Sequence, residues 1–240
     1  MALEPLALGL IAAPSIAGGA LAVSVLAGFF LRRPLKLLSG GGVDQRRPLA
    51  WGCVAILGVV AGAGLLCAAA WTAPARLWPL LAAWPAGLAF VWLDSRGEAR
   101  AAAAELAGVV AFAAVPAALS LLAGWAPSAA LALAGLMAGR SVPTVITIRA
   151  YLRRQKGQLV SVWPALAASI AAVVAVIILA RAGLASWTAT PAMALLLVRS
   201  WSLLGPLEPR LSATTVGKIE VVLGGLWVLL VALGAARLPR

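Results

Sequence analysis

Apolar stretches long enough to cross a lipid bilayer follow one another from one end of this chain to the other. Hydrophobic residues make up 63% of its 240 positions, the mean hydropathy is +1.04, and no polar stretch exceeds about 17 residues. A chain in hydrocarbon must satisfy its backbone polar groups internally, so helices are the expected elements. The sequence therefore predicts an all-α polytopic transmembrane helical bundle, with residues 1–240 forming a single domain.

The apolar stretches predict eight or nine helices. Seven clear spans are expected at 49–71, 77–93, 104–124, 127–148, 160–180, 184–203 and 218–236. Residues 5–31 would cover about 40 Å as one helix against a hydrocarbon core of about 30 Å. They form either one tilted, kinked helix or a hairpin that turns at Pro14 and Ser15, with a second span at 16–31. We favour the hairpin, with a truncated first helix. Gly58 and Gly62 are expected to bring neighbouring helices close together.

Basic residues gather on alternate loops. The loops at 32–48, 94–105, 149–159 and 199–220 contain 14 Lys or Arg residues, and the opposite ends of the spans contain four. The positive-inside rule then predicts a plasma-membrane protein with these loops in the cytoplasm and the C-terminus outside. The net charge of +12 is expected to contact anionic lipid headgroups rather than nucleic acid. Because histidine is absent, His-based metal sites and Ser-His triads are excluded, and we expect no metal and no cofactor.

Arg140 stands near the middle of the apolar run LALAGLMAGRSVPTVITI. A guanidinium at bilayer depth is disfavoured unless it has a partner or faces a polar cavity. One interpretation is structural, with Arg140 paired to carbonyl groups freed by Pro143 or to a neighbouring acid. The other is an anion site that opens to the cytoplasm. Either way, Arg140 is expected to face the bundle interior within reach of an acid from residues 94–105, above all Glu105.

The segment WLDSRGEARAAAAEL carries alternating charges: Asp94, Arg96, Glu98, Arg100 and Glu105. These residues can pair with one another at the start of a helix, with Asp94 near its N-cap. Alternatively, the carboxylates line a cavity at the inner membrane surface, where they bind a cation or hold an arginine. Both interpretations remain open at this stage.

Further basic residues flank this region. Beyond Arg140 the helix is expected to continue to Arg149 and Arg153, so an anion from the cytosol would meet a graded series of guanidinium groups. Arg33 and Lys36 belong to the first basic loop, whose Gly40–Gly42 turn could move over such a site. The alternative is a solvated loop that only fixes topology.

Several segments resemble the YwiC-like family of bacterial multi-pass membrane proteins, in order and at similar spacing. They are EPLALGLIAAPSIAG with LRRPLKL, DSRGEARAAAAELAG, GRSVPTVITIRAYLRR and IEVVLGGLWVLLVALG. This resemblance implies an integral membrane protein with no established biochemical activity. Relatives carry a His-Gly-Ala-Trp type motif upstream of the segment that corresponds to EPLALGL. The absence of this motif here favours a truncated first helix.

The loop arrangement also resembles UbiA-type intramembrane prenyltransferases, which implies isoprenyl diphosphate bound through Asp-rich motifs and Mg²⁺. Only Asp94 and Glu98 form such a motif here, so the two clusters that this chemistry needs are incomplete. Three classes stay open: binding of an anionic amphiphile or membrane lipid around Arg140, a UbiA-like or other lipid-modifying enzyme, and a small-solute transporter. The oligomeric state does not follow from the sequence.

Overall fold

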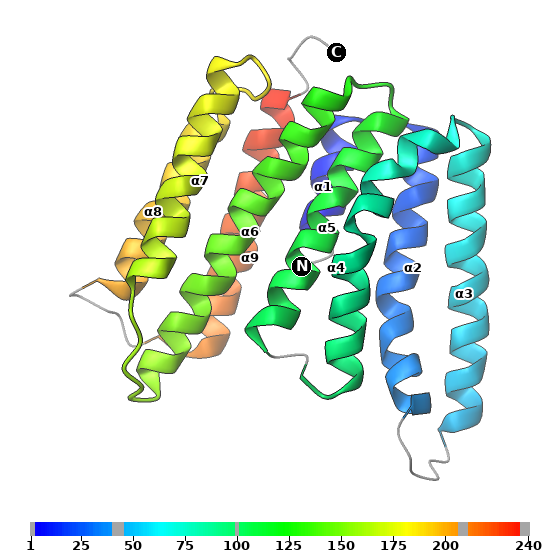
Figure 1. Cartoon of the computed structure of the whole chain (residues 1–240), viewed down its shortest axis with the longest axis horizontal. Helices are drawn as coiled ribbons and strands as arrows, with labels where there is room; N and C mark the ends of the chain where they lie inside the picture. The colour runs from blue at the N-terminus through cyan, green and yellow to red at the C-terminus, as the bar shows by residue number, and fades with distance from the viewer. Residues whose placement is uncertain (1–2, 40–45, 99–100, 206–210, 236–240) are drawn as a thin grey trace.

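A computed structural model of the chain describes residues 3–39, 46–98, 101–205 and 211–235. Helices run along a common direction, and no strand occurs in these described ranges (Figure 1). The elements are α1 (Leu3–Ala12), α2 (Ile16–Ser39), α3 (Arg47–Ala70), the short 3₁₀ helix η1 (Pro74–Leu77), α4 (Trp78–Ser95), α5 (Ala102–Leu122), α6 (Pro127–Gln155), α7 (Trp163–Arg181), α8 (Ala189–Leu204) and α9 (Ala213–Ala235). The predicted all-α fold is confirmed.

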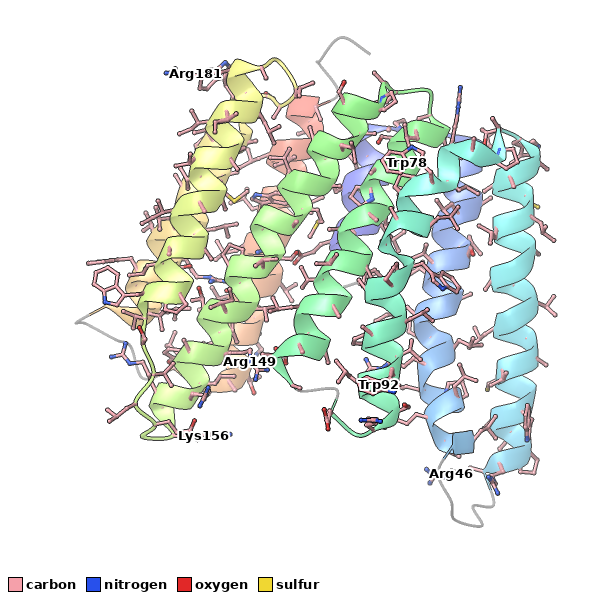
Figure 2. All side chains as sticks on the ribbon, in the orientation of Figure 1. Arg46, Trp78, Trp92, Arg149, Lys156 and Arg181 are labelled. Carbon is pink, nitrogen blue, oxygen red and sulfur yellow. The ribbon has the colours of Figure 1, made fainter. Side chains whose placement is uncertain are left out.

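Seven of the described helical segments are long and apolar enough to cross a membrane, and α1 and α8 are shorter apolar helices. Together with the composition this makes the protein a multi-pass membrane protein. The helices run up and down in turn, so alternate connections share one end of the bundle (Figure 1). Arg46 and Lys156 lie at one end and Arg181 lies at the other, as Figure 2 shows. The basic connections therefore gather at one end, which we call the basic end.

The predicted N-terminal hairpin is confirmed. Helix α1 stops at Ala12 and α2 starts at Ile16, with the turn stabilised by a hydrogen bond from the Gly18 amide to Ser15 Oγ at 2.9 Å. Helix α2 is longer than the predicted span, since it continues past Pro34 to Ser39. Proline is tolerated inside a membrane helix where other groups satisfy the freed carbonyl. The glycine turn at 40–42 lies outside the described residues.

The extended α2 corrects one expectation and α6 confirms another. Arg33 and Lys36 belong to a helix and not to a loop. Arg149 and Arg153 lie on α6, as expected, because this helix runs for 29 residues. That length corresponds to about 43 Å, well beyond a hydrocarbon core of about 30 Å. The last turns of α6 thus bring basic side chains out at the basic end.

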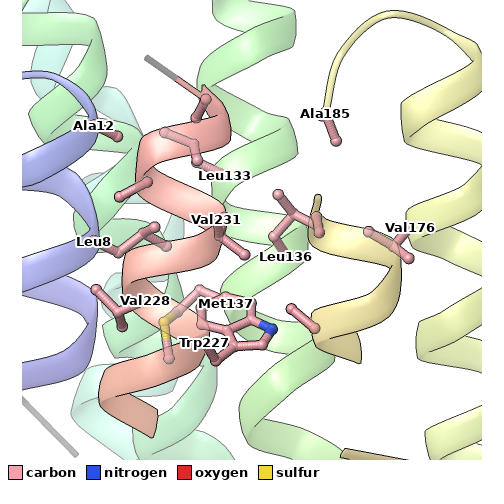
Figure 3. Close-up of a cluster of buried hydrophobic side chains, with 14 of the residues drawn as sticks. Leu8, Ala12, Leu133, Leu136, Met137, Val176, Ala185, Trp227, Val228 and Val231 are labelled. Atoms are coloured by element: carbon pink, nitrogen blue, oxygen red, sulfur yellow. The ribbon is translucent and has the colours of Figure 1, made fainter. Parts of the chain in front are cut away.

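The centre of the bundle lies around α5 and α6. Two thirds (67%) of the apolar window of α5 is buried within the protein, compared with 11% for α3 and for α4, which lie toward the outside. The largest buried cluster joins α1, α6, α7, α8 and α9, with Met137 and Trp227 near its middle and Leu8 on its α1 side (Figure 3). Because α1 packs on both α5 and α9, it ties the two halves of the chain together.

Helices α2 and α3 approach through a glycine other than the expected pair. A Cβ atom added at Gly58 or Gly62 would meet nothing within 4 Å in the described structure, so the predicted packing role of this pair is wrong within the chain. A Cβ atom at Gly64 would lie 2.7 Å from the carbonyl oxygen of Ala20. Next to it, Ser24 Oγ donates a hydrogen bond to the Ala61 carbonyl at 2.7 Å. Small and hydroxyl residues thus form this contact.

Candidate functional site

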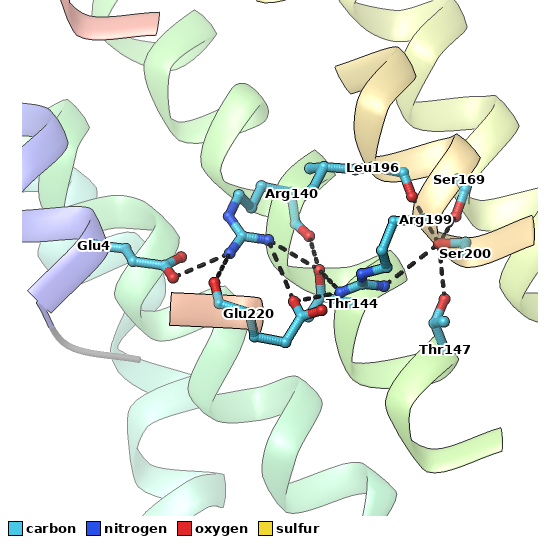
Figure 4. A network of polar contacts seen from close by, with 9 residues as sticks. All are labelled: Glu4, Arg140, Thr144, Thr147, Ser169, Leu196, Arg199, Ser200 and Glu220. Carbon is cyan, nitrogen blue, oxygen red and sulfur yellow. Dashed lines mark hydrogen bonds and ion pairs between the residues drawn. The ribbon is translucent and has the colours of Figure 1, made fainter. Parts of the chain in front are cut away.

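Arg140 lies in the middle of α6 with only 2% of its side chain exposed. Its guanidinium donates hydrogen bonds to Glu4 Oε1 at 3.0 Å, to Thr144 Oγ1 at 3.1 Å and to the Glu220 carbonyl oxygen at 3.4 Å (Figure 4). The prediction that Arg140 faces the interior and pairs with an acid is confirmed. The prediction that this acid comes from residues 94–105 is wrong, because α1 and α9 supply the carboxylates.

A second buried arginine lies beside the first. Arg199 of α8 is 8% exposed, and its Nη2 atom forms a short ion pair with Oε2 of Glu220. The same carboxylate oxygen lies 4.0 Å from Nη1 of Arg140. Glu220 therefore bridges two guanidinium groups from two helices. Arg199 belongs to the predicted basic loop at 199–220, and its burial in α8 corrects that expectation.

These four residues form what we call the inner charge cluster: Glu4, Arg140, Arg199 and Glu220 (Figure 4). Two positive and two negative side chains balance each other, which is the arrangement that makes charge tolerable inside a membrane. Hydroxyl groups continue the network, as Ser200 Oγ contacts Thr147 Oγ1 at 3.1 Å and Ser169 Oγ at 3.2 Å. The cluster and its hydroxyls join helices α1, α6, α7, α8 and α9.

The backbone of α9 allows the cluster to close. At Gly224 an added Cβ atom would overlap the Glu4 carboxylate and lie 2.7 Å from Nη2 of Arg140. Only a residue without a side chain at position 224 allows the Glu4–Arg140 ion pair to pack against the backbone of α9. Trp227, one turn further along α9, places its ring 6.0 Å from the Arg140 guanidinium carbon, within cation–π range.

A cavity of about 330 Å³ begins at the inner charge cluster. Its charged lining comes from Glu4, Arg140 and Glu220 at the inner side, and from Glu105 and Arg149 nearer the basic end. Most of the remaining wall is apolar and comes from α5 and α6. These apolar residues include Val109, Phe112, Ala113, Met137, Val145, Ile148 and Leu152. The cavity is partly open to the surroundings.

Glu105 and Arg149 form an ion pair at the outer part of this cavity. Arg149 Nη1 lies 2.9 Å from Glu105 Oε2, and both side chains are about one third exposed, at 31% and 29%. Glu105 is in the first turn of α5, where the helix dipole favours an acid. We call this pair the mouth pair. Glu105 thus reaches the predicted cavity, but it holds Arg149 rather than Arg140.

The other acids of the 94–105 segment lie elsewhere. Asp94 is buried in the last turn of α4, where it pairs with Arg32 and, at 3.1 Å, with Lys36 of α2. It therefore joins α4 to α2 and is not an N-cap. Glu98 is exposed, and Arg96 stacks on the Trp92 ring at 3.9 Å. These three residues are absent from the lining of the cavity.

Two further predicted residues, Arg33 and Arg153, do not contribute to the cavity. Arg33 is exposed on α2, and Arg153 is exposed on α6, where its Nε atom donates to Gln158 at 2.8 Å. Arg100 lies outside the described residues. Of the expected series of arginines along α6, the structure brings only Arg140 and Arg149 to the cavity wall.

Glu4, Glu220 and Arg199 are members of the site that the sequence does not predict. Arg199 carried the same signal as Arg140, since it interrupts the apolar run MALLLVRSWSLL. Both acids stand near the ends of apolar segments, which is where loop residues are normally found. Only the packing of α1 and α9 against α6 shows that these carboxylates reach Arg140.

Comparisons with known proteins yield one family match. The model of a family described as YwiC-like protein matches residues 1–120, which is half of the chain. The matched part includes Glu4 and Glu105, whereas Arg140, Arg199 and Glu220 lie beyond it. No curated protein and no solved structure matches the chain. The architectural resemblance to UbiA-type prenyltransferases thus gains no support from a structural comparison.

Proposed function

This chain belongs to the YwiC-like protein family, and from that premise we propose that it binds an amphiphile or lipid through an anionic group in the cavity beside Arg140. The observation that carries the proposal is the cavity itself, which joins two arginine–glutamate pairs through a largely apolar wall. Ligand sites are commonly apolar pockets with a few converging polar groups. An amphiphile matches both parts of this lining.

Arg140 has donors left for a ligand. A guanidinium carries five N–H groups, and those of Arg140 make three hydrogen bonds within the protein. Its Nε atom is buried and has no hydrogen-bond partner among the described residues. A buried donor without a partner is unfavourable, so a phosphate or carboxylate oxygen that reached Nε after a shift of the Arg140 side chain would gain a charge-assisted hydrogen bond there.

The volume restricts which part of the ligand enters. Ligand pockets usually measure roughly 300–1,000 Å³, so 330 Å³ is near the lower end. The cavity therefore accommodates a headgroup and the first part of a chain, while the rest of a lipid tail stays in the bilayer. Arg149 at the mouth would receive the headgroup first because it lies nearer the basic end, which we propose to be cytoplasmic.

The test is binding of defined lipids to the purified full chain in a neutral detergent. Phosphatidylglycerol and a diacylglycerol with the same acyl chains would be titrated while the thermal transition of the protein is followed. We expect the phosphate-bearing lipid to raise the transition temperature and the diacylglycerol to leave it unchanged. Arg140→Gln should remove most of the shift.

Arg181→Gln is the matched control, because this arginine lies at the opposite end of the bundle. It should leave the lipid-dependent shift intact. Equal shifts for wild-type protein and the Arg140→Gln variant, both still correctly inserted, would refute binding at this site. So would equal shifts for the two lipids.

No observation raises the other two classes above this one. A prenyltransferase requires carboxylates that meet around bridging Mg²⁺. Asp94, Glu98 and Glu105 do not converge, and the described residues include no group of three candidate metal ligands. For a transporter of polar solutes, we would expect polar groups along the bundle from end to end. The cavity instead ends at the inner charge cluster.

A further inference from the structure

We infer that the headgroup bound in this cavity carries an ammonium group beside its anionic group, and that Glu4 receives the ammonium while Arg140 receives the anion. This inference rests on the proposed function and names the chemical class of the ligand: a zwitterionic amphiphile of the phosphoethanolamine type. It follows from the charge balance of the cavity and from the different numbers of guanidinium groups that contact Glu4 and Glu220.

The lining of the cavity is not a positive site overall. Three acidic residues line it, Glu4, Glu105 and Glu220, against the two arginines Arg140 and Arg149. Arg199, which lies behind Glu220, supplies the third positive charge of this set. An anion without a countercharge would therefore add one unbalanced negative charge at bilayer depth, where burial of a charge is disfavoured. A zwitterion preserves the balance.

Glu4 is the carboxylate that can change partners. Glu220 is 16% exposed and lies between two guanidinium groups, whereas Glu4 is 28% exposed. Within the described part of the chain, Arg140 is the one hydrogen-bonding partner of the Glu4 carboxylate, at 3.0 Å. When a phosphate oxygen takes the place of Glu4 on Arg140, the freed carboxylate needs a cation nearby. An ammonium on the same headgroup lies within reach.

The exchange replaces one ion pair within the protein by two between protein and ligand. An ammonium offers three N–H donors to Glu4, and the phosphate offers several acceptor oxygens to Arg140. The mouth pair repeats the same combination of acid and guanidinium at a shallower position, with 2.9 Å between its nitrogen and oxygen atoms. A zwitterionic headgroup thus finds matched charges on both levels of the cavity.

The experiment compares phosphatidylethanolamine with phosphatidylglycerol of identical acyl chains, each titrated against the purified full chain in neutral detergent. These lipids share the phosphodiester and differ in the amine. Wild-type protein should bind the ethanolamine lipid about tenfold more tightly, which is what one hydrogen-bonded charge pair supplies. Soluble phosphoethanolamine serves as a third probe, and weak binding by it would show that the acyl chains are also recognised.

Glu4→Gln is the decisive variant because it removes the carboxylate and keeps the size of the side chain. It should abolish the preference for the ethanolamine lipid, while Glu4→Asp should retain most of it. Glu98→Gln removes an exposed acid away from the cavity and should behave as wild type. Size-exclusion profiles would establish that each variant is still folded.

Two outcomes would overturn the inference while leaving the proposed function intact. One is phosphatidylglycerol binding as tightly as the ethanolamine lipid to wild-type protein, still dependent on Arg140. The other is a preference for the ethanolamine lipid that persists undiminished in Glu4→Gln, since the Glu4 carboxylate would then not be the group that receives the ammonium. If neither lipid binds, or Arg140→Gln changes nothing, the proposed function itself fails.

Discussion

Among the carboxylates, Glu220 is the one whose removal should lower the free energy of unfolding most. It lies between Arg140 and Arg199, whose side chains are 2% and 7% exposed. Glu220→Gln would leave two buried guanidinium groups with Glu4 as the remaining acid of the inner charge cluster. Removing one partner of a buried ion pair destabilises a protein by about 3–5 kcal/mol. We expect a loss of free energy of unfolding in that range.

The mouth pair provides the internal comparison. Glu105 and Arg149 are 29% and 31% exposed, and pairs open to solvent contribute only about 0–1 kcal/mol. Glu105→Gln should therefore cost at least about 2 kcal/mol less than Glu220→Gln, a difference of roughly thirtyfold in the unfolding equilibrium. Both substitutions exchange the same acid for the same amide, so the contrast isolates burial.

Reversible unfolding of the detergent-solubilised protein in increasing dodecyl sulfate, followed by tryptophan fluorescence, would measure both values. The double variant Glu220→Gln with Arg199→Gln tests the pairing, because it removes one charge of each sign and leaves Arg140 with Glu4. It should be more stable than Glu220→Gln alone. If the two single Glu variants cost the same, or if the effects of Glu220→Gln and Arg199→Gln simply add, the reasoning is refuted.

Three other changes probe the rest of the bundle. Asp94→Asn should lower the free energy of unfolding by about 1–3 kcal/mol, because a buried carboxylate loses two cations of α2, and the same dodecyl sulfate titration would show it. Gly64→Ala should cost about 1–3 kcal/mol through overlap with the α2 backbone, whereas Gly58→Ala should change stability by less than about 0.5 kcal/mol; equal effects would contradict the packing. In a background without native cysteines, a cysteine at Lys156 should react with an impermeant thiol reagent only after the cells are opened, and one at Arg181 in intact cells. Labelling in the reverse order would invert the proposed topology.

The fold could be predicted from the sequence because lipid leaves few alternatives. Apolar length fixed the number of helices, and the hairpin at Pro14 followed from comparing the length of residues 5–31 with the thickness of a bilayer. Helix ends were less predictable. Residues 32–39 are rich in Arg and Lys, a composition that predicts a loop, yet their backbone is helical. Long basic side chains can extend to the headgroups from a helix that continues past the hydrocarbon core.

The candidate site was only half predictable. Arg140 was identified because the energetic penalty on a buried guanidinium is visible in one local stretch of sequence. Its partners, Glu4 and Glu220, lie 136 and 80 positions away in the sequence. Hydropathy carries no information about contacts over such separations. Glu105 was selected because it lies near Arg140 along the expected loops. The deciding fact was instead that the ten residues of α1 cover about 15 Å, half a bilayer, so that Glu4 reaches the depth of Arg140.

The distribution of acids explains how a chain of net charge +12 has a balanced interior. Only seven acids occur in the sequence, and four of them pair with an arginine of another helix: Glu4, Asp94, Glu105 and Glu220. The surplus of positive charge consequently remains at the ends of the helices, where we propose that it contacts lipid headgroups. Surface attraction to anionic lipid and selection inside the cavity are thus separate properties. We propose that the net charge draws a headgroup to the membrane surface of this protein, whereas binding in the cavity requires a match to an acid as well as to a guanidinium.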